Sequence, residues 1–287
     1  MSLLPAISLL GATPPGELWR SWSPDPLALA GVTIALGLFF QGFCRLRRRN
    51  PVHAPWSRAG LFLAGITVIL VGIVSPLDTI AEEYLQSAHM LQHVLIADLG
   101  VALTLLAVRG PLAVFFLPRD LLVPLARTRW LRRALARLVR PGVALPLWLL
   151  VLVVWHIPRL YEGALRHPAV HRLEHVSFVV VGALVWTLII DPARHGTLTL
   201  GERIGVAAVL FWASQILSYV MVFSFEPFYG LYADQTERLL GLSPLTDQKL
   251  AGVVMMVEQT VTIGVAVVLL VRASRRAGVR TGWEPVP

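Results

Sequence analysis

Residues 78–106 read DTIAEEYLQSAHMLQHVLIADLGVALTLL, with polar and metal-binding side chains in the first half and an almost entirely apolar second half. In an α-helix, residues four apart lie on one face with Cβ atoms about 5–6 Å apart. His89 and His93 therefore form a pair of imidazole ligands at the mouth of a predicted membrane helix, and Glu82 and Gln86 precede them on the same stripe. Because histidine is costly in hydrocarbon, the pair indicates a functional site.

The composition indicates a membrane protein. The chain has 287 residues, of which 56% are hydrophobic and 15% charged, and its mean hydropathy is +0.68. These values are too apolar for a soluble domain of this length. The net charge of +8 comes almost entirely from arginine, which we assign to loops that set membrane orientation and not to nucleic-acid binding. The single cysteine, Cys44, excludes an internal disulfide and a cysteine metal cluster.

Seven apolar segments predict an all-α, multi-pass membrane protein with seven transmembrane helices. The predicted spans are 27–43, 59–74, 83–108, 142–157, 168–190, 204–223 and 250–271. Residues 1–25 are expected to form an external N-terminal lead-in, residues 26–273 the membrane domain, and residues 274–287 a basic cytoplasmic tail. The arginine-rich segment 127–140 predicts an amphipathic helix that lies on an anionic membrane surface.

The basic residues are distributed unevenly among the connections. The segments after the first, third, fifth and seventh spans share one side of the membrane and hold 19 of the 25 Lys and Arg residues. The positive-inside rule makes that side cytoplasmic, so that the N-terminus lies outside and the C-terminus inside.

Six of the eight histidines fall at the outer ends of three predicted spans, and no topology rule requires this convergence. They are His89 and His93 on the third, His156 on the fourth, and His167, His171 and His175 before or on the fifth. Because Pro168 is expected to begin the fifth helix, His167 should lie in the preceding loop. His53 and His195 are expected to be incidental residues of cytoplasmic loops.

Methionines near these histidines favour copper as the metal. The candidates are Met90, Met221 and Met255, although each could instead fill the core. Thioether and imidazole ligands together suit Cu(I) better than zinc or iron. Neutral donors also favour a monovalent ion, because the cost of burying an ion rises steeply with its charge. Glu82 and Glu174 are expected to accept the second ring N–H of ligating histidines.

Two carboxylates are predicted inside the membrane helices. Asp98 follows His93 by five residues, about 140° farther round an α-helix, and is expected to point away from the histidine pair. Glu258 lies midway along the seventh span. The two residues fit either a proton or ion path or a hydrogen-bonded clamp between helices, and the clamp is the preferred interpretation.

Short motifs over residues 75–270 occur together in one order. They are SPL at 75–77, SAHMLQH at 87–93, RGP at 109–111, WHIPRLY at 155–161, HRLEH at 171–175 with Trp186, and DQKLAG at 247–252. In this combination the chain resembles the seven-span CtaG-like family of cytochrome c oxidase assembly factors. The resemblance implies His89, His93, His156, His171 and His175 as signature histidines.

The resemblance further implies a protein of the bacterial plasma membrane that takes part in the maturation of a haem–copper oxidase, with copper handling as its role. An oxidase subunit and an extracytoplasmic copper donor would be its partners. We expect a carrier of Cu(I) and not an enzyme.

Two other functions fit parts of the pattern. His171-x-x-Glu174-His175 matches the inverted zinc-peptidase motif, in which two histidines bind zinc and the glutamate is the general base. Bis-histidine haem ligation between the third and fifth spans is the second. An absorption spectrum separates haem from copper, and metal analysis separates copper from zinc.

The predicted topology can be tested with a reporter fused after Pro287. A reporter that is active only in the cytoplasm should be active at this position. Activity of a strictly periplasmic reporter at the same position would overturn the topology and, with it, the placement of the histidines.

Overall fold

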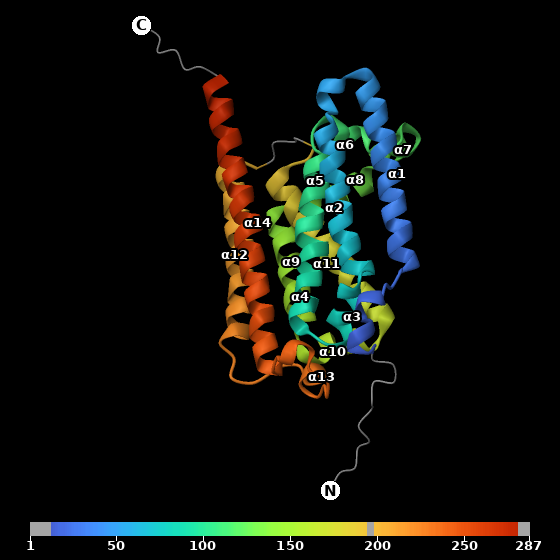
Figure 1. Cartoon of the computed structure of the whole chain (residues 1–287). Helices are drawn as coiled ribbons and strands as arrows, with labels where there is room; N and C mark the ends of the chain where they lie inside the picture. The colour runs from blue at the N-terminus through green and yellow to red at the C-terminus, as the bar shows by residue number, and fades with distance from the viewer. Residues whose placement is uncertain (1–12, 194–197, 281–287) are drawn as a thin grey trace.

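The computed structural model describes residues 13–193 and 198–280, and these residues form helices and no strands. Six helical segments are long and apolar enough to cross a membrane. They comprise α1 (Pro26–Arg49), α2 (Trp56–Val74), α4 with α5 (Gln86–Val108), α11 (Pro168–Ile190), α12 (Leu200–Val222) and α14 (Pro244–Arg280). Figure 1 shows them side by side as one bundle. The all-α membrane fold is therefore confirmed.

The fourth predicted span is the short helix α9 (Pro141–Trp155), which meets α8 (Arg129–Leu138) at 67°. At 1.5 Å per residue, α9 is about 22 Å long and does not by itself cross a hydrocarbon core of about 30 Å. Counting α8 with α9 gives seven spans. The amphipathic segment predicted at 127–140 corresponds to α8, which has no buried residue.

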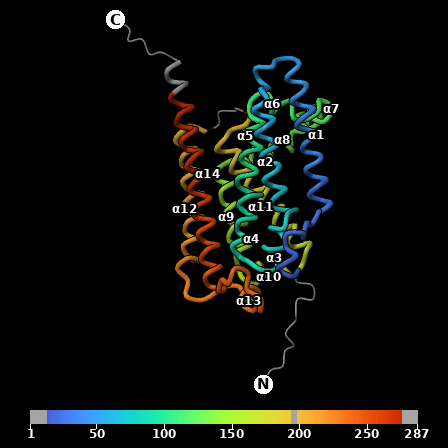
Figure 2. Tube along the Cα trace, viewed as in Figure 1, coloured from blue at the N-terminus to red at the C-terminus, as the bar shows by residue number. Residues whose placement is uncertain are grey.

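The two ends of the bundle carry different short helices. One end, which we call the site end, holds η1 (Pro15–Arg20), α3 (Pro76–Glu83), α10 (Pro158–Arg166) and α13 (Gly230–Ala233), and the opposite end holds α6 (Pro111–Phe115) and α7 (Arg119–Arg127) (Figure 1). The trace in Figure 2 starts its described part at the site end and ends α14 at the opposite end. Chain ends on opposite sides of the bundle correspond to an odd number of crossings, as in the count of seven that includes α8 with α9.

The predicted external lead-in is folded onto the site end in its described part. Leu18 of η1 is buried in a cluster with Ala81, Tyr84, Leu85 and Ala88. The hydroxyl of Tyr84 donates a hydrogen bond to the Thr13 carbonyl. This segment therefore covers the loop between α3 and α4.

The third predicted span begins later than expected and is built from three pieces. Tyr84 and Leu85 leave the helical conformation, so α3 is a separate helix, and α4 (Gln86–Val94) starts afresh. The carboxylate of Asp247 from α14 accepts hydrogen bonds from the backbone N–H of Gln86 at 2.7 Å and of Ser87 at 3.2 Å. It thereby satisfies donors at a helix N-terminus that have no partner within the helix.

A π-turn, η3 (Leu95–Leu99), joins α4 to α5 (Gly100–Val108). Hydrogen bonds in a π-turn connect residues five apart, which changes the face on which the following side chains lie. The expectation that Asp98 points away from His93 was wrong, because the π-turn brings both residues to the lining of one cavity. Gly182 of α11 packs directly against the Ala97 carbonyl of this turn.

Asp98 forms the polar clamp that the sequence predicted. Trp186 Nε1 of α11 donates to Asp98 Oδ1 at 2.5 Å, and the side-chain amide of Gln259 from α14 donates to the other oxygen. Glu258 lies beside this group and is bridged to it by the same amide. The clamp joins the third span to α11 and α14, deep in the bundle.

Asp78 of α3 connects the lead-in to the third span. It accepts hydrogen bonds from the Ser23 hydroxyl at 2.7 Å and from the Gln92 side-chain amide at 2.6 Å. Burial of the carboxyl group, with a smaller effect of the nearby Glu82 charge, raises the pKa of Asp78 from 3.8 to about 6.

We expect Gly182→Ala to destabilise the bundle by about 1–3 kcal/mol, because the new methyl group overlaps the backbone of the π-turn. Thermal unfolding in detergent measures the effect. The matched control is Gly264→Ala in α14, where no atom lies within 4 Å of the new Cβ. Equal melting temperatures for the two variants would contradict close packing at Gly182.

Asp78 should make stability depend on pH. A carboxyl group whose pKa is raised on folding stabilises the fold fully below pH 3.8, and the contribution is lost as the pH rises through about 6. The wild-type protein should therefore lose stability relative to Asp78→Asn across this window, as measured by melting temperatures at several pH values. A difference that does not change with pH would show that Asp78 does not titrate there.

Candidate metal centre

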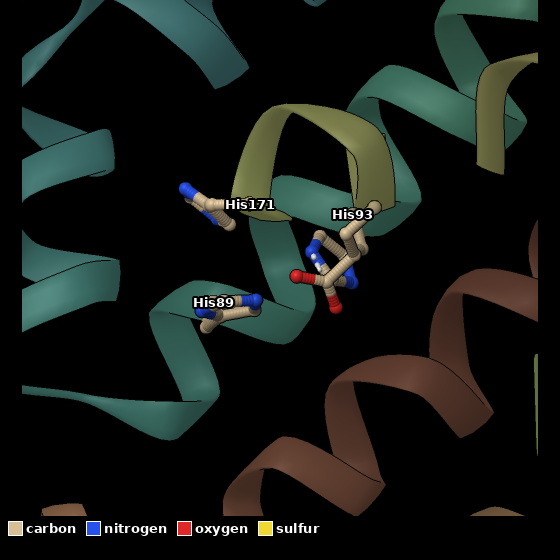
Figure 3. Close-up of side chains that lie close together, drawn as sticks. His89, His93 and His171 are labelled. Atoms are coloured by element: carbon tan, nitrogen blue, oxygen red, sulfur yellow. Dashed lines mark ion pairs between the residues drawn. The ribbon is translucent and has the colours of Figure 1, made fainter. Parts of the chain in front are cut away.

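Four buried side chains from α4 and α11 meet at the site end of the bundle. One ligand atom from each of His89, His93, His171 and Glu174 lies within 4.8 Å of all the others. We call this group the His/Glu cluster. Figure 3 shows the three labelled histidines close together between the helices. His89 is 0% and Glu174 1% exposed, so water does not solvate the donors at the centre.

The cluster holds polar atoms that lack hydrogen-bond partners. They are Nε2 of His89, both ring nitrogens of His93, Nε2 of His171 and both carboxylate oxygens of Glu174. His93 Nε2 and Glu174 Oε1 are 3.7 Å apart. Buried polar atoms are almost always paired, and an unpaired one costs about 1–3 kcal/mol. A bound cation would accept lone pairs from Glu174 and from one ring nitrogen of each histidine, so the donors present fit a metal ion.

The tautomer of His89 is set by a tyrosine of α13. Tyr232 donates its only hydroxyl proton to the Ala81 carbonyl at 2.6 Å, and the same oxygen lies 3.4 Å from His89 Nδ1. The hydroxyl therefore acts as acceptor toward His89, which places the ring proton on Nδ1. The lone pair on Nε2 is left for the centre of the cluster.

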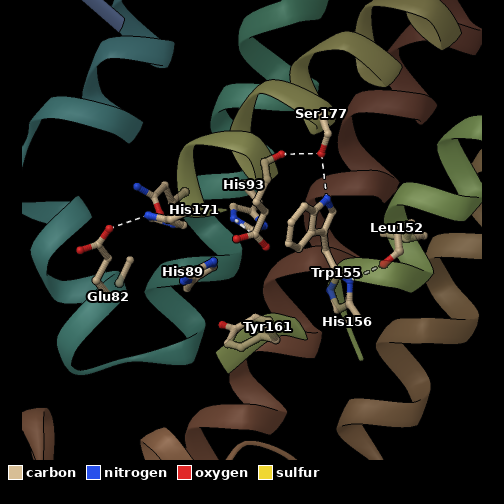
Figure 4. A network of polar contacts seen from close by, with 12 residues as sticks. Glu82, His89, His93, Leu152, Trp155, His156, Tyr161, His171 and Ser177 are labelled. Carbon is tan, nitrogen blue, oxygen red and sulfur yellow. Dashed lines mark hydrogen bonds and ion pairs between the residues drawn. The ribbon is translucent and has the colours of Figure 1, made fainter. Parts of the chain in front are cut away.

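The orientation of His171 is set by Glu82. Its Nδ1 lies 2.5 Å from Glu82 Oε1, which is the dashed contact in Figure 4. Glu82 was expected on the stripe of His89, as an outer partner of a ligand. Glu82 does contact a ring nitrogen of the cluster, but the ring is that of His171 and not that of His89. The reason is the break at Tyr84 and Leu85, which separates α3 from α4.

Glu174 lies inside the group of four, whereas the sequence suggested a place behind the ligands. Glu174 follows His171 by three residues, and residues three apart share one face of a helix. The spacing in the HRLEH motif was therefore a signal for this position. The backbone carbonyl of Glu174 accepts a hydrogen bond from Ser177, which in turn accepts one from Trp155 Nε1 at the end of α9 (Figure 4).

His175 and His156 lie beside the cluster and outside the group of four. The His175 ring is 4.1 Å from that of His171 and 5.3 Å from that of His93, and its buried Nε2 has no partner. His156 Nδ1 lies 2.7 Å from the Leu152 carbonyl, which leaves its buried Nε2 unpaired (Figure 4). The carbonyl contact places the ring proton of His156 on Nδ1, so its Nε2 keeps a free lone pair near the cluster.

The three candidate methionines share one buried cluster at the site end. Met90, Met221 and Met255 pack there with Tyr161, Tyr229, Tyr232 and Ala251. Met90 and Met255 also line a cavity with His93 and His156, and Met221 is not among its lining residues. The sequence placed Tyr161, Tyr229 and Tyr232 at the outer face but gave no signal that they would pack with the methionines, because these residues lie far apart along the chain.

The remaining histidines lie outside the cluster. His167 precedes α11, as Pro168 predicted, and is exposed. His53 is exposed in η2 (Pro51–His53), and His195 lies outside the described residues.

A groove leads to the cluster from the side of α1. It has a volume of about 620 Å³ and is lined by residues of α1, α2 and α11. Its polar end carries Asp25, Asp78 and Glu82 together with His171 and His175. Arg172 also lines this end and pairs with Asp25 at 2.9 Å. Glu82 is the carboxylate there that contacts the cluster, so the groove gives a cation an approach to the histidines.

Comparison with known proteins identifies the family. The family described as cytochrome c oxidase caa3 assembly factor matches residues 37–277, a range that includes the whole His/Glu cluster. Neither the curated proteins nor the solved structures contain a match. The resemblance seen in the short sequence motifs is thereby confirmed, and the chain belongs to the cytochrome c oxidase caa3 assembly factor family.

Proposed function

We propose that this chain binds copper at the His/Glu cluster, at the outer face of the bacterial plasma membrane, and holds it for the assembly of a haem–copper oxidase. The observation that carries the proposal is a set of buried, unpaired lone pairs in a member of an oxidase assembly family. In this role the chain is a carrier and not an enzyme. An oxidase subunit receives the copper, and an extracytoplasmic donor supplies it.

Charge balance supports a monovalent ion. The four ligands must be deprotonated to bind a metal ion, so in the metal-bound site Glu174 contributes one negative charge and the three histidines contribute neutral imidazoles. Cu(I) bound by these four residues gives a neutral group, whereas a divalent ion leaves a net positive charge whose burial is costly. The nearest further carboxylate, Glu82, is 39% exposed and is screened by solvent. Imidazole nitrogen is also a good ligand for copper.

The surrounding residues keep the donors ready for the ion. Tyr232 and Glu82 each hold a ring nitrogen that faces away from the centre, so His89 and His171 present Nε2 without rearrangement. Such outer partners typically change metal affinity by about 10–100-fold. The groove beside α1 supplies the approach, with carboxylates at its polar end.

The zinc-peptidase interpretation requires different roles for the same residues. His171 and His175 would both bind zinc, and Glu174 would stay off the metal to act as general base. The grouping of Glu174 with His89 and His93, and the place of His175 outside that group, favour a metal-holding site. A haem protein would show a Soret band in its absorption spectrum.

Titration of the purified, reduced protein against a Cu(I) chelator tests the proposal. The double variant His89→Ala/His171→Ala should lose the copper held by the cluster, because two of its four ligands are removed. Glu82→Gln should weaken binding by about 10–100-fold, and Glu174→Gln should weaken it without abolishing it. The control is His53→Ala, which removes an exposed histidine far from the cluster and should change nothing.

Three results would contradict copper holding. Unchanged copper content in His89→Ala/His171→Ala would refute the site. Zinc that outcompetes copper, together with a Glu174→Gln variant that keeps its metal and loses a hydrolytic activity, would establish the peptidase. A Soret band in the purified protein would establish haem ligation.

A further inference from the structure

A cavity of about 70 Å³ lies deeper in the bundle, on the far side of His93 from the rest of the His/Glu cluster. Residues of α4, η3, α9, α11, α12 and α14 line it. The lining includes His93, His156, Met90, Met255, Asp98 and Gln259, but neither His89 nor His171. A water molecule occupies about 30 Å³, so the cavity has room for an ion. The side chain of His93 therefore belongs to the cluster and also lines the cavity.

The lining nitrogen that is free to bind an ion is Nε2 of His156. The short contact between His156 Nδ1 and the Leu152 carbonyl requires a proton on Nδ1, because a carbonyl oxygen can only accept. Nε2 therefore carries a lone pair, and it is buried without a partner. His93 has a second unpaired ring nitrogen beyond the one that faces Glu174.

Two thioethers complete the set of soft donors. Met90 is 1% and Met255 is 5% exposed, and the two residues come from different helices, α4 and α14. Thioether sulfur binds Cu(I) and is a poor ligand for hard divalent ions. The convergence of one imidazole and two thioethers on a single cavity is the pattern that such a site requires.

The carboxylate in the lining of this cavity is engaged in the clamp. Both oxygens of Asp98, the only carboxylate in its lining, already accept hydrogen bonds from Trp186 and Gln259. Glu258 contacts the clamp but does not line the cavity. Neutral, soft donors remain, and these favour a monovalent ion in a buried position.

We propose that this cavity is a second copper position, bound by His156 Nε2 and by the sulfur atoms of Met90 and Met255, with His93 between it and the His/Glu cluster. The inference rests on the proposed function, in which the cluster binds copper first. The two positions differ in chemistry: the cluster offers nitrogen and oxygen donors, and the inner position offers nitrogen and sulfur. His93 can contact an ion in either position, so it provides a route between them.

Copper stoichiometry combined with X-ray absorption of the purified full chain tests the inner position. The wild-type protein should bind two equivalents of Cu(I), with sulfur among the atoms bonded to copper. Met90→Leu/Met255→Leu should bind one equivalent and lose the sulfur signal. Leucine and methionine exchange with little loss of stability. Met256→Leu is the matched control, because Met256 follows Met255 on α14 without lining the cavity, and it should keep both equivalents and the sulfur signal.

The complementary variant separates the two proposals. His89→Ala/His171→Ala should lose one equivalent and keep the copper that is bonded to sulfur. One equivalent in the wild type, without sulfur and unaffected by Met90→Leu/Met255→Leu, would overturn the inner position and leave the cluster standing. Loss of all copper in His89→Ala/His171→Ala would also overturn an independent inner position. No copper in the wild type would overturn both proposals.

Discussion

The carboxylate of Asp247 accepts hydrogen bonds from the first backbone N–H groups of α4, and the geometry of the His/Glu cluster depends on this contact. A helix N-terminus at the edge of a membrane needs partners for its free donors. Asp247 supplies them from α14, so the chain can break after α3 and restart. The restart fixes the height and rotation of His89 and His93, and it frees Glu82 to reach His171.

The π-turn also changes the side of the helix on which the side chains after His93 lie. Five residues separate His93 from Asp98, and one π-turn between them is enough to bring both to the same cavity. Gly182 permits the close approach of α11 to this turn. The hydrogen bonds of Trp186 and Gln259 to Asp98 then hold the turn against two other helices. These contacts thereby fix the part of the cavity lining that the turn, α11 and α14 provide.

The donors are sorted by chemical type along the axis of the bundle. The negative charge of Glu174 lies with three histidines, next to a groove whose polar end carries further carboxylates. The thioethers of Met90 and Met255 line the deeper cavity together with the neutral donor His156 Nε2. In the proposed function, charge attracts and captures the ion, and soft neutral ligands hold it where burying charge is most costly.

The sequence by itself determined the helical spans and the convergence of histidines at one end of the bundle. Hydropathy and four-residue spacing are local properties, so they predicted α11 at 168–190 and both histidine pairs without knowledge of packing. Tertiary structure alone decided that Glu82 holds His171, that Tyr232 holds His89 and that Asp98 faces inward. The first two contacts join residues about 90 and 143 positions apart, and the third depends on a π-turn held by packing. No pattern within one helix encodes such contacts, because their geometry is set by how separate helices meet.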